Sequence, residues 1–206
     1  MCAKKRSVKI AIERGWIGWD NLQRLLNRIP DDMGRSLGAV LFLGGFRVSE
    51  ALQLTDGQVF VEGDFIKLDR VRLLKKWRYT DAFDEDGNRV RERLDVYTVR
   101  VFPIDEPIVP YFTDWMWEVR RRGGGRLYDV SRFTAYRLIR EHTGLFPHFF
   151  RSLRAIQLVV EYGWSAVQLR SFFNWENMNT VFTYAGLGAS ELAKAFPMDR
   201  QRLWRR

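Results

Sequence analysis

The hydrophobic pattern changes at Thr55-Asp56-Gly57, and this change constrains the fold more than any other feature of the sequence. Before it, apolar residues recur at helical spacing, as between Trp19 and Ile29. After it, branched and aromatic residues alternate in part with polar ones, which is typical of strands. Such stretches span Val59–Val61, Phe65–Leu74 and Val96–Ile104. Helical patterns then return, so we expect an α+β fold that is mainly α-helical: a helical bundle with a small antiparallel sheet of about three strands.

Capping residues and glycines set the expected helix boundaries. Asp31 is suited to cap a buried helix from Met33 to Leu43, which Gly44-Gly45 ends. The polar stretch Asp84–Asn88 predicts a turn at the tip of a long hairpin. Further helices are expected at Val48–Leu54, Ile108–Arg122, Arg132–His142, His148–Glu161, Ala166–Phe172, Met178–Tyr184 and Glu191–Phe196, with Ser131 and Ser190 as caps.

The length of 206 residues is enough for one domain with a real core. We expect three parts along the chain. Residues 1–18 form a basic N-terminal arm, with a short helix around Ile10–Arg14. Residues 19–185 form the main domain, and residues 186–206 form a C-terminal helix and basic tail.

The net charge of +9 favours a polyanionic partner, nucleic acid before membrane. The alternative is a basic but otherwise ordinary enzyme. The apolar stretch Leu37–Phe46 is too short to span a membrane and is broken by glycines, and no secretory signal is visible at the N-terminus. We therefore expect a nucleic acid to be a better candidate partner than a lipid surface.

The single cysteine, Cys2, excludes an internal disulfide and a cysteine-based metal cluster. Two histidines in the whole chain disfavour a histidine-rich metal site. We expect a reducing, intracellular setting.

His148 and Arg151 are three residues apart, which is about one helical turn. At the start of a helix they would point the same way, beside backbone N–H groups that lack helical partners. A proton-transfer group, a fixed cation and a helix N-terminus then converge on one spot, which suits a phosphate. The alternative is a solvated pair beside an aromatic patch.

Three other stretches carry candidate residues. Arg47 follows two glycines at a helix start and has an open approach to an anion, with Glu50 one turn on to hold it; an ordinary exposed ion pair is the alternative. Lys75-Lys76, late in a strand of the hairpin, either reach a phosphate or simply keep a sheet edge solvated. Tyr184 lies nine positions after Trp175, and the tyrosine ring could also simply fill the core.

Taken together, these stretches resemble the tyrosine recombinases, the Cre, Xer and phage-integrase family. The segment from Gly45 to Leu52 looks like the first catalytic box, and His148-Phe149-Phe150-Arg151 with Ala155 is similar to the second. The stretch from Asn174 to Tyr184 resembles the nucleophile region, with Trp175 where most members have a second histidine. Each motif alone is weak, but four in the family order with suitable spacing are a strong signal.

The resemblance implies a site-specific recombinase or integrase that acts on double-stranded DNA through a 3′-phosphotyrosyl intermediate, with no metal and no nucleotide cofactor. It makes Tyr184 the nucleophile and His148 its proton acceptor, and it makes Lys75 the acid for the leaving 5′-oxygen, with Lys76 as the alternate. The implied catalytic set is Arg47, Lys75, His148, Arg151, Trp175 and Tyr184. The arginines and the indole N–H would stabilise charge on the phosphoryl oxygens.

The chain also departs from the family pattern. Phe173-Asn174 replaces the usual Leu-Gly, Arg151–Arg154 differs from the commoner Arg-His-Ser/Thr-Phe, and the hairpin is longer than is typical. Fewer than twenty residues precede the first expected helix, so we expect the DNA-clamping domain of most members to be absent. The missing domain and Asn174 keep open a second function, a DNA-binding accessory or regulatory protein that does not cleave. Relaxation by a type IB topoisomerase also stays open, because it uses similar chemistry.

The segment after the candidate nucleophile has a short apolar face. In the family, such a segment often docks on a neighbouring protomer, so self-association on DNA is expected; packing on the chain's own core is the alternative. The apolar positions are Leu187, Leu192, Ala195 and Phe196.

Overall fold

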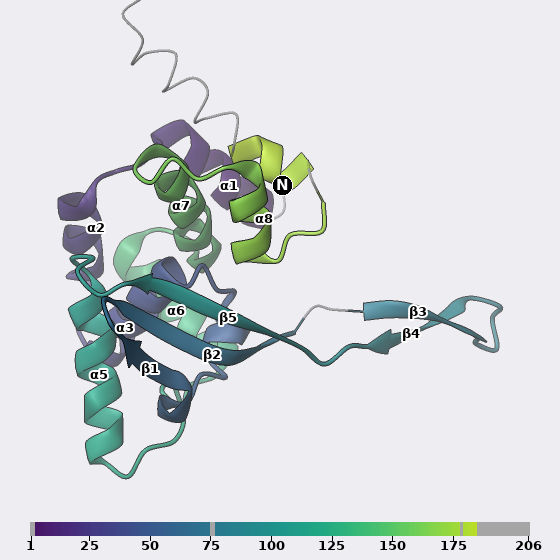
Figure 1. The fold of residues 1–206 in the computed structure, drawn as a ribbon, viewed down its shortest axis with the longest axis horizontal. Coiled ribbons are helices and arrows are strands. Elements are labelled where there is room, and N and C mark those ends of the chain that lie inside the picture. The colour runs from purple at the N-terminus through teal and green to yellow at the C-terminus, as the bar shows by residue number, and fades with distance from the viewer. Residues whose placement is uncertain (1–2, 75–76, 178, 185–206) are drawn as a thin grey trace, which may run out of the picture. The chain divides into compact units, whose positions relative to one another are not determined.

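The computed structural model describes residues 3–74, 77–177 and 179–184 (Figure 1). The chain divides into two compact units, Gly18–Arg151 and the pair of segments Met1–Ile17 and Ser152–Arg206. Each unit is described by itself. The predicted C-terminal helix Glu191–Phe196 lies outside the described residues.

The larger unit begins with three helices: α2 (Trp19–Leu26), α3 (Asp32–Leu43) and α4 (Val48–Ala51). Helix α3 is apolar and buried along most of its length, so it forms the centre of this unit's core. Its predicted cap is confirmed, because an Asp31 carboxylate oxygen accepts a hydrogen bond from the backbone N–H of Gly34 at 2.7 Å.

A three-stranded antiparallel sheet follows, as predicted. Its strands are β1 (Val59–Glu62), β2 (Phe65–Leu73) and β5 (Val96–Pro103), in the order β1-β2-β5. Residues on β2 and β5 alternate between buried and exposed positions, and Ile66 pairs with Phe102 on the buried face. The sheet therefore packs one face on the helices and leaves the other face exposed.

The long hairpin contains a sheet of its own, which the sequence did not predict. Strands β3 (Trp77–Phe83) and β4 (Arg89–Arg93) pair only with each other within the described residues, and Figure 1 shows this ribbon extending away from β2 and β5. The predicted polar turn at its tip is confirmed: an Asp84 carboxylate oxygen accepts from the backbone N–H of Asn88 at 2.8 Å.

Two further helices complete the larger unit, and α7 runs on from it. The two helices are α5 (Val109–Arg121) and α6 (Arg132–Thr143), and α7 spans Pro147–Val160. The predicted Ser131 cap of α6 is confirmed, and α6 ends at Gly144 in the left-handed conformation, with φ +71°.

The smaller unit holds the rest of α7, α8 (Ala166–Phe173) and a helical segment at residues 179–184. At the N-terminus, α1 spans Ala3–Arg14. This helix is longer than the short one expected around Ile10–Arg14, because its N-terminal half has little hydrophobic periodicity to reveal it. Among the described residues, no helix has the length and apolar character needed to cross a bilayer.

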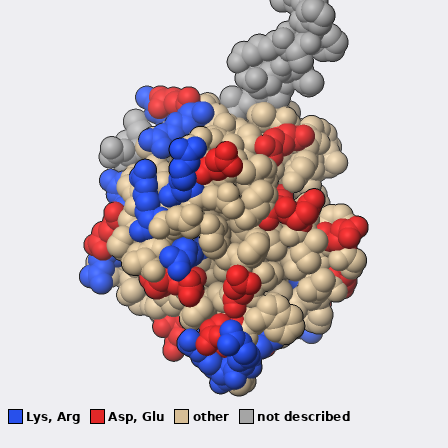
Figure 2. Space-filling model, turned by 90° about the vertical axis from the view of Figure 1, so that its left-hand side faces the viewer, with Lys and Arg blue, Asp and Glu red and all other residues tan. Residues whose placement is uncertain are grey.

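Charge is unevenly spread over the surface. On the face drawn in Figure 2, basic side chains gather toward one side and at the lower end, where α5 ends in Figure 1, and acidic side chains lie between them. The last turn of α5 carries Arg120 and Arg121, followed by Arg122. The end of α5 is therefore one place where basic side chains gather.

Candidate active site

The glycine pair before Arg47 is required by packing and by backbone conformation. A Cβ atom on Gly44 would lie 2.1 Å from the ring of Phe46, which is fully buried. Gly45 has φ +59°, a left-handed conformation that other residues rarely adopt. The two glycines therefore let the chain fold over the Phe46 ring and deliver Arg47 to the start of α4.

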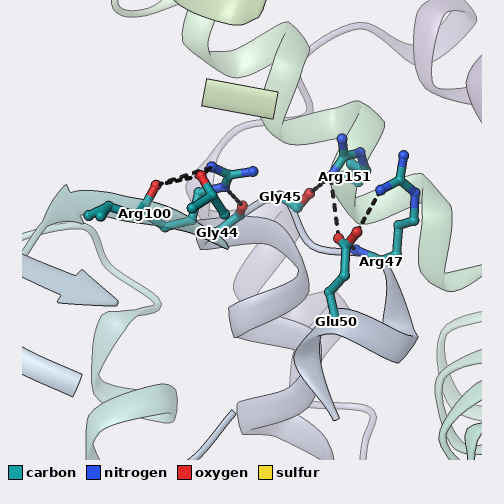
Figure 3. Close-up of polar contacts among 8 residues, drawn as sticks. Gly44, Gly45, Arg47, Glu50, Arg100 and Arg151 are labelled. Atoms are coloured by element: carbon teal, nitrogen blue, oxygen red, sulfur yellow. Dashed lines mark hydrogen bonds and ion pairs between the residues drawn. The ribbon is translucent and has the colours of Figure 1, made fainter. Parts of the chain in front are cut away.

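Glu50 is the centre of the site (Figure 3). Its side chain is fully buried, and its carboxylate accepts from the backbone N–H of Arg47 at 2.9 Å and from Arg47 Nη1 at 2.5 Å. The same carboxylate lies 3.9 Å from Arg151 Nη1. Two arginines that are more than a hundred residues apart thus meet on one carboxylate.

Arg151 is held from a second direction. Its side chain is buried, and its Nη1 donates to the backbone carbonyl of Gly45. Arg47, by contrast, keeps 32% of its side chain exposed. The buried Arg151 is therefore a fixed cation, and Arg47 is the part of the pair that a ligand from solvent can reach.

A third arginine, Arg100 on β5, belongs to the same cluster and was missed in the sequence. Its Nε donates to the carbonyl of Gly44 at 3.1 Å, and its guanidinium lies over the Phe46 ring at 5.8 Å from the centroid. Burial lowers its pKa to about 10, so it stays charged at neutral pH. The sequence did contain a sign of its burial. Arg100 is two residues before the buried Phe102, so both side chains point to the same face of the strand.

Consecutive carbonyls of the glycine loop are thus bound from two sides. Arg100, on the sheet, donates to the carbonyl of Gly44, and Arg151, on α7, donates to the carbonyl of Gly45 (Figure 3). The loop that carries Arg47 is fixed between them. Two of the three guanidinium groups meet the buried Glu50 carboxylate and the third lies in the same cluster, which leaves excess positive charge suited to a phosphate.

His148 and the two candidate lysines have different outcomes. His148 lies in the first turn of α7, one turn before Arg151, and is half-buried. The predicted helix start is therefore confirmed, and the role of His148 stays a prediction. Lys75 and Lys76 lie outside the described residues.

Trp175 and Tyr184 come together in the smaller unit. Their rings stack at 5.2 Å between centroids with an interplanar angle of 12°, and Trp175 also stacks on Phe173 at 4.4 Å. Tyr184 is 2% exposed, and its hydroxyl donates to Ser152 Oγ at 3.0 Å. The candidate nucleophile is thus buried and hydrogen-bonded in this structure; nothing in the sequence pointed to Ser152 as its partner.

Metal-ligating side chains do not cluster in the part of the chain that the structure describes: no group of three or more His, Cys, Asp or Glu residues is placed to hold a metal ion.

Comparisons with known proteins bear on the fold. No family model matches the chain, and no curated protein matches it. Solved structures do. The XerH site-specific recombinase, bound to a palindromic difH substrate, has a TM-score of 0.58 at 15% identity, with 88% of this chain and 52% of that one covered.

Two more solved structures agree. The Tn1549 transposon integrase, in complex with transposon right-end DNA, has a TM-score of 0.54 at 15% identity, over 86% of this chain and 65% of that one. The catalytic domain of bacteriophage HP1 integrase has a TM-score of 0.50 at 16% identity, over 91% of this chain and 96% of that domain.

The chain has the fold of a tyrosine recombinase catalytic domain. It spans about half the length of the XerH protein and most of the HP1 catalytic domain. The α+β architecture expected from the sequence is thereby confirmed. At 15–17% identity the likeness concerns the fold alone.

Proposed function

We propose that this chain breaks and rejoins DNA strands through a 3′-phosphotyrosyl intermediate, in site-specific recombination or integration. The observation that supports it most is the meeting of Arg47 and Arg151 on the Glu50 carboxylate. Two separated sequence motifs predicted a phosphate-binding pair, and these motifs supply its two cations. The fold supports the same conclusion, since the XerH and Tn1549 structures that share it are complexes with DNA.

The proposed reaction uses each residue for a defined step. The Tyr184 oxygen attacks the scissile phosphorus in line, a Tyr–O–P bond forms and the bond from phosphorus to the 5′-oxygen breaks. His148 accepts the phenol proton, and Lys75 gives a proton to the leaving 5′-oxygen. Attack by a different 5′-hydroxyl reverses the step and joins new strands, and this chemistry needs neither a metal nor a nucleotide cofactor.

The remaining groups stabilise the transition state. Negative charge builds up on the phosphoryl oxygens as phosphorus becomes five-coordinate. The partly exposed Arg47 can donate hydrogen bonds to these oxygens, and the buried Arg151 contributes its fixed positive charge. The indole N–H of Trp175 is a further donor. Before attack, the Tyr184 hydroxyl must leave Ser152 Oγ, so the stacked and hydrogen-bonded arrangement is a resting state.

The test is covalent trapping. The protein is incubated with a pool of nicked duplexes of randomised sequence, and protein–DNA complexes that survive denaturation are counted. We expect such a complex from the wild type and none from Tyr184→Phe. Strand exchange between two sites, rather than relaxation of a supercoiled plasmid alone, would separate a recombinase from type IB topoisomerase chemistry.

A second candidate is a DNA-binding accessory protein that does not cleave. The specific observation in its favour is the burial of Tyr184, whose hydroxyl is already hydrogen-bonded to Ser152. Ordinary DNA affinity with no covalent complex across the whole duplex pool would select this alternative and reject the enzyme.

Self-association through residues 186–206 belongs to the same proposal, and this segment lies outside the described residues. Removing the chain from Leu187 onward should reduce assembly on DNA while leaving single copies bound. Unchanged assembly would mean that the segment packs on its own chain.

A further inference from the structure

The β3–β4 ribbon exposes an unusual amount of aromatic surface. Trp77, Tyr79 and Phe83 are 55%, 61% and 63% exposed. Trp77 and Tyr79 share one face of β3 because they are two residues apart, and Arg91 on β4 lies over the Tyr79 ring at 5.9 Å. Aromatic and arginine side chains dominate the energetic centres of protein interfaces.

The ribbon also lacks support of its own. Isolated two-stranded ribbons are marginally stable in water, because they have no second layer on which to bury side chains. Within the described residues, β3 and β4 pair only with each other. A partner that covers Trp77 and Tyr79 would supply the missing layer.

The charge of the ribbon identifies the kind of partner. Residues 80–89, at the far end, carry four acidic side chains and one basic one. These acids would be repelled by DNA phosphates and attracted to a basic protein surface. The chain itself has a net charge of +9, so a second copy offers such a surface.

One basic surface of the larger unit matches the tip. The segment from Glu118 to Arg126, at the end of α5, carries four arginines and one acid, the reverse of the ribbon tip. The Arg121 and Arg122 side chains are 73% and 63% exposed, and Trp117 beside them is 51% exposed. Charge and aromatic content are thus both complementary to the ribbon.

We propose that the β3–β4 ribbon docks on the basic end of α5 in a second copy of this chain. The contact joins two different surfaces, so it is not self-complementary and builds a ring or a chain of copies. It rests on the proposed function in one respect: DNA gathers the copies that make the contact.

The test places a photo-crosslinking residue, p-benzoylphenylalanine, at Phe83 of the full chain. Isotopically labelled and unlabelled copies are mixed with a duplex of random sequence and irradiated, and mass spectrometry assigns the products. We expect crosslinks between copies, ending in the Glu118–Arg126 segment. Crosslinks to DNA, to another surface of the second copy, or to nothing would each overturn the proposal.

Matched charge variants test the electrostatic part. The triple change Asp81→Asn/Glu85→Gln/Asp86→Asn leaves Asp84 to hold the turn. It should lower the yield of crosslinks between copies severalfold. Its control removes three exposed acids elsewhere and should leave the yield unchanged: Asp64→Asn/Asp105→Asn/Asp129→Asn. Equal yields from the two triple variants would overturn the proposal.

A charge swap completes the design. Arg121→Glu/Arg122→Glu should abolish the crosslink, and adding Glu85→Lys/Asp86→Lys in the partner copy should restore it. DNA affinity is measured on the same samples by fluorescence anisotropy. A protein that binds DNA without crosslinking overturns this inference alone, whereas a protein that fails to bind DNA overturns the proposed function.

Discussion

Replacing Arg100 with methionine should slow the reaction strongly while changing the free energy of unfolding only a little. Burial lowers the pKa of Arg100 to about 10, well below the ordinary value of a guanidinium group. Because each pKa unit corresponds to 1.36 kcal/mol, burying this charge costs about 3 kcal/mol at neutral pH. The side chain is 1% exposed, so solvent screens little of that cost.

Hydrogen bonds offset the cost of burial. Arg100 donates to the carbonyls of Gly44 and Val99, both at 3.1 Å, and to Thr98 Oγ1 at 2.6 Å. At about 1 kcal/mol each, these bonds roughly balance the charging cost. Methionine removes both contributions at similar volume, so Arg100→Met should change the free energy of unfolding by less than about 1.5 kcal/mol.

The chemistry should respond much more strongly. Without Arg100, the loop that carries Arg47 loses its anchor to the sheet, and a displacement near 1 Å costs on the order of 100-fold in rate. Urea unfolding measures the stability, and single-turnover formation of the covalent complex at saturating DNA measures the rate. Arg28→Met, at an exposed position, is the control and should change neither.

The pH dependence gives an independent check on Arg100. Its pKa is lower in the folded protein, so above pH 10 the unfolded chain binds more protons and the wild type gains stability. When the pH is raised from 9 to 11, the free energy of unfolding of the wild type should rise by about 1 kcal/mol relative to that of Arg100→Met. A variant that loses more than about 3 kcal/mol at pH 7 with an unchanged rate would refute the reasoning, because Arg100 would then be a structural support.

Three more substitutions test neighbouring parts of the account. Glu50→Gln leaves the clustered arginines without their carboxylate and should destabilise the protein by about 3–5 kcal/mol in thermal unfolding; an unchanged melting temperature would contradict this. Ser152→Ala removes the acceptor that holds the buried phenol, so covalent-complex formation should rise by roughly fivefold as stability falls by about 1 kcal/mol, and a slower reaction would count against a resting state. Gly44→Ala drives a methyl group into the Phe46 ring and should cost about 1–3 kcal/mol, whereas Gly57→Ala, which meets open space, should cost far less; equal losses would rule out the clash.

Local signals in the sequence were enough for most of the fold. The Asp31 and Ser131 caps act within three residues, and the strands of the three-stranded sheet repeat every second residue, so both are visible in short windows. The separate β3–β4 ribbon was missed because its aromatic residues are exposed rather than buried. Such a strand carries no alternation between core and solvent from which to recognise it.

The candidate site was only partly predictable for a related reason. Arg47 and Arg151 stand in motifs, and Glu50 was expected to hold Arg47 from one turn away. Two contacts depend on tertiary packing between segments far apart in the chain. Glu50 also faces Arg151, and Arg100 binds the glycine loop. No local pattern records such contacts.

Mapping the covalent bond itself tests the central claim most directly. The complex formed on nicked duplexes is digested with protease and nuclease, and the peptide that carries a nucleotide is sequenced by mass spectrometry. The account predicts a 3′-phosphotyrosyl bond at Tyr184 in the wild type and no nucleotide-bearing peptide from Tyr184→Phe. A bond at any other residue, or an adduct that persists in Tyr184→Phe, would contradict it.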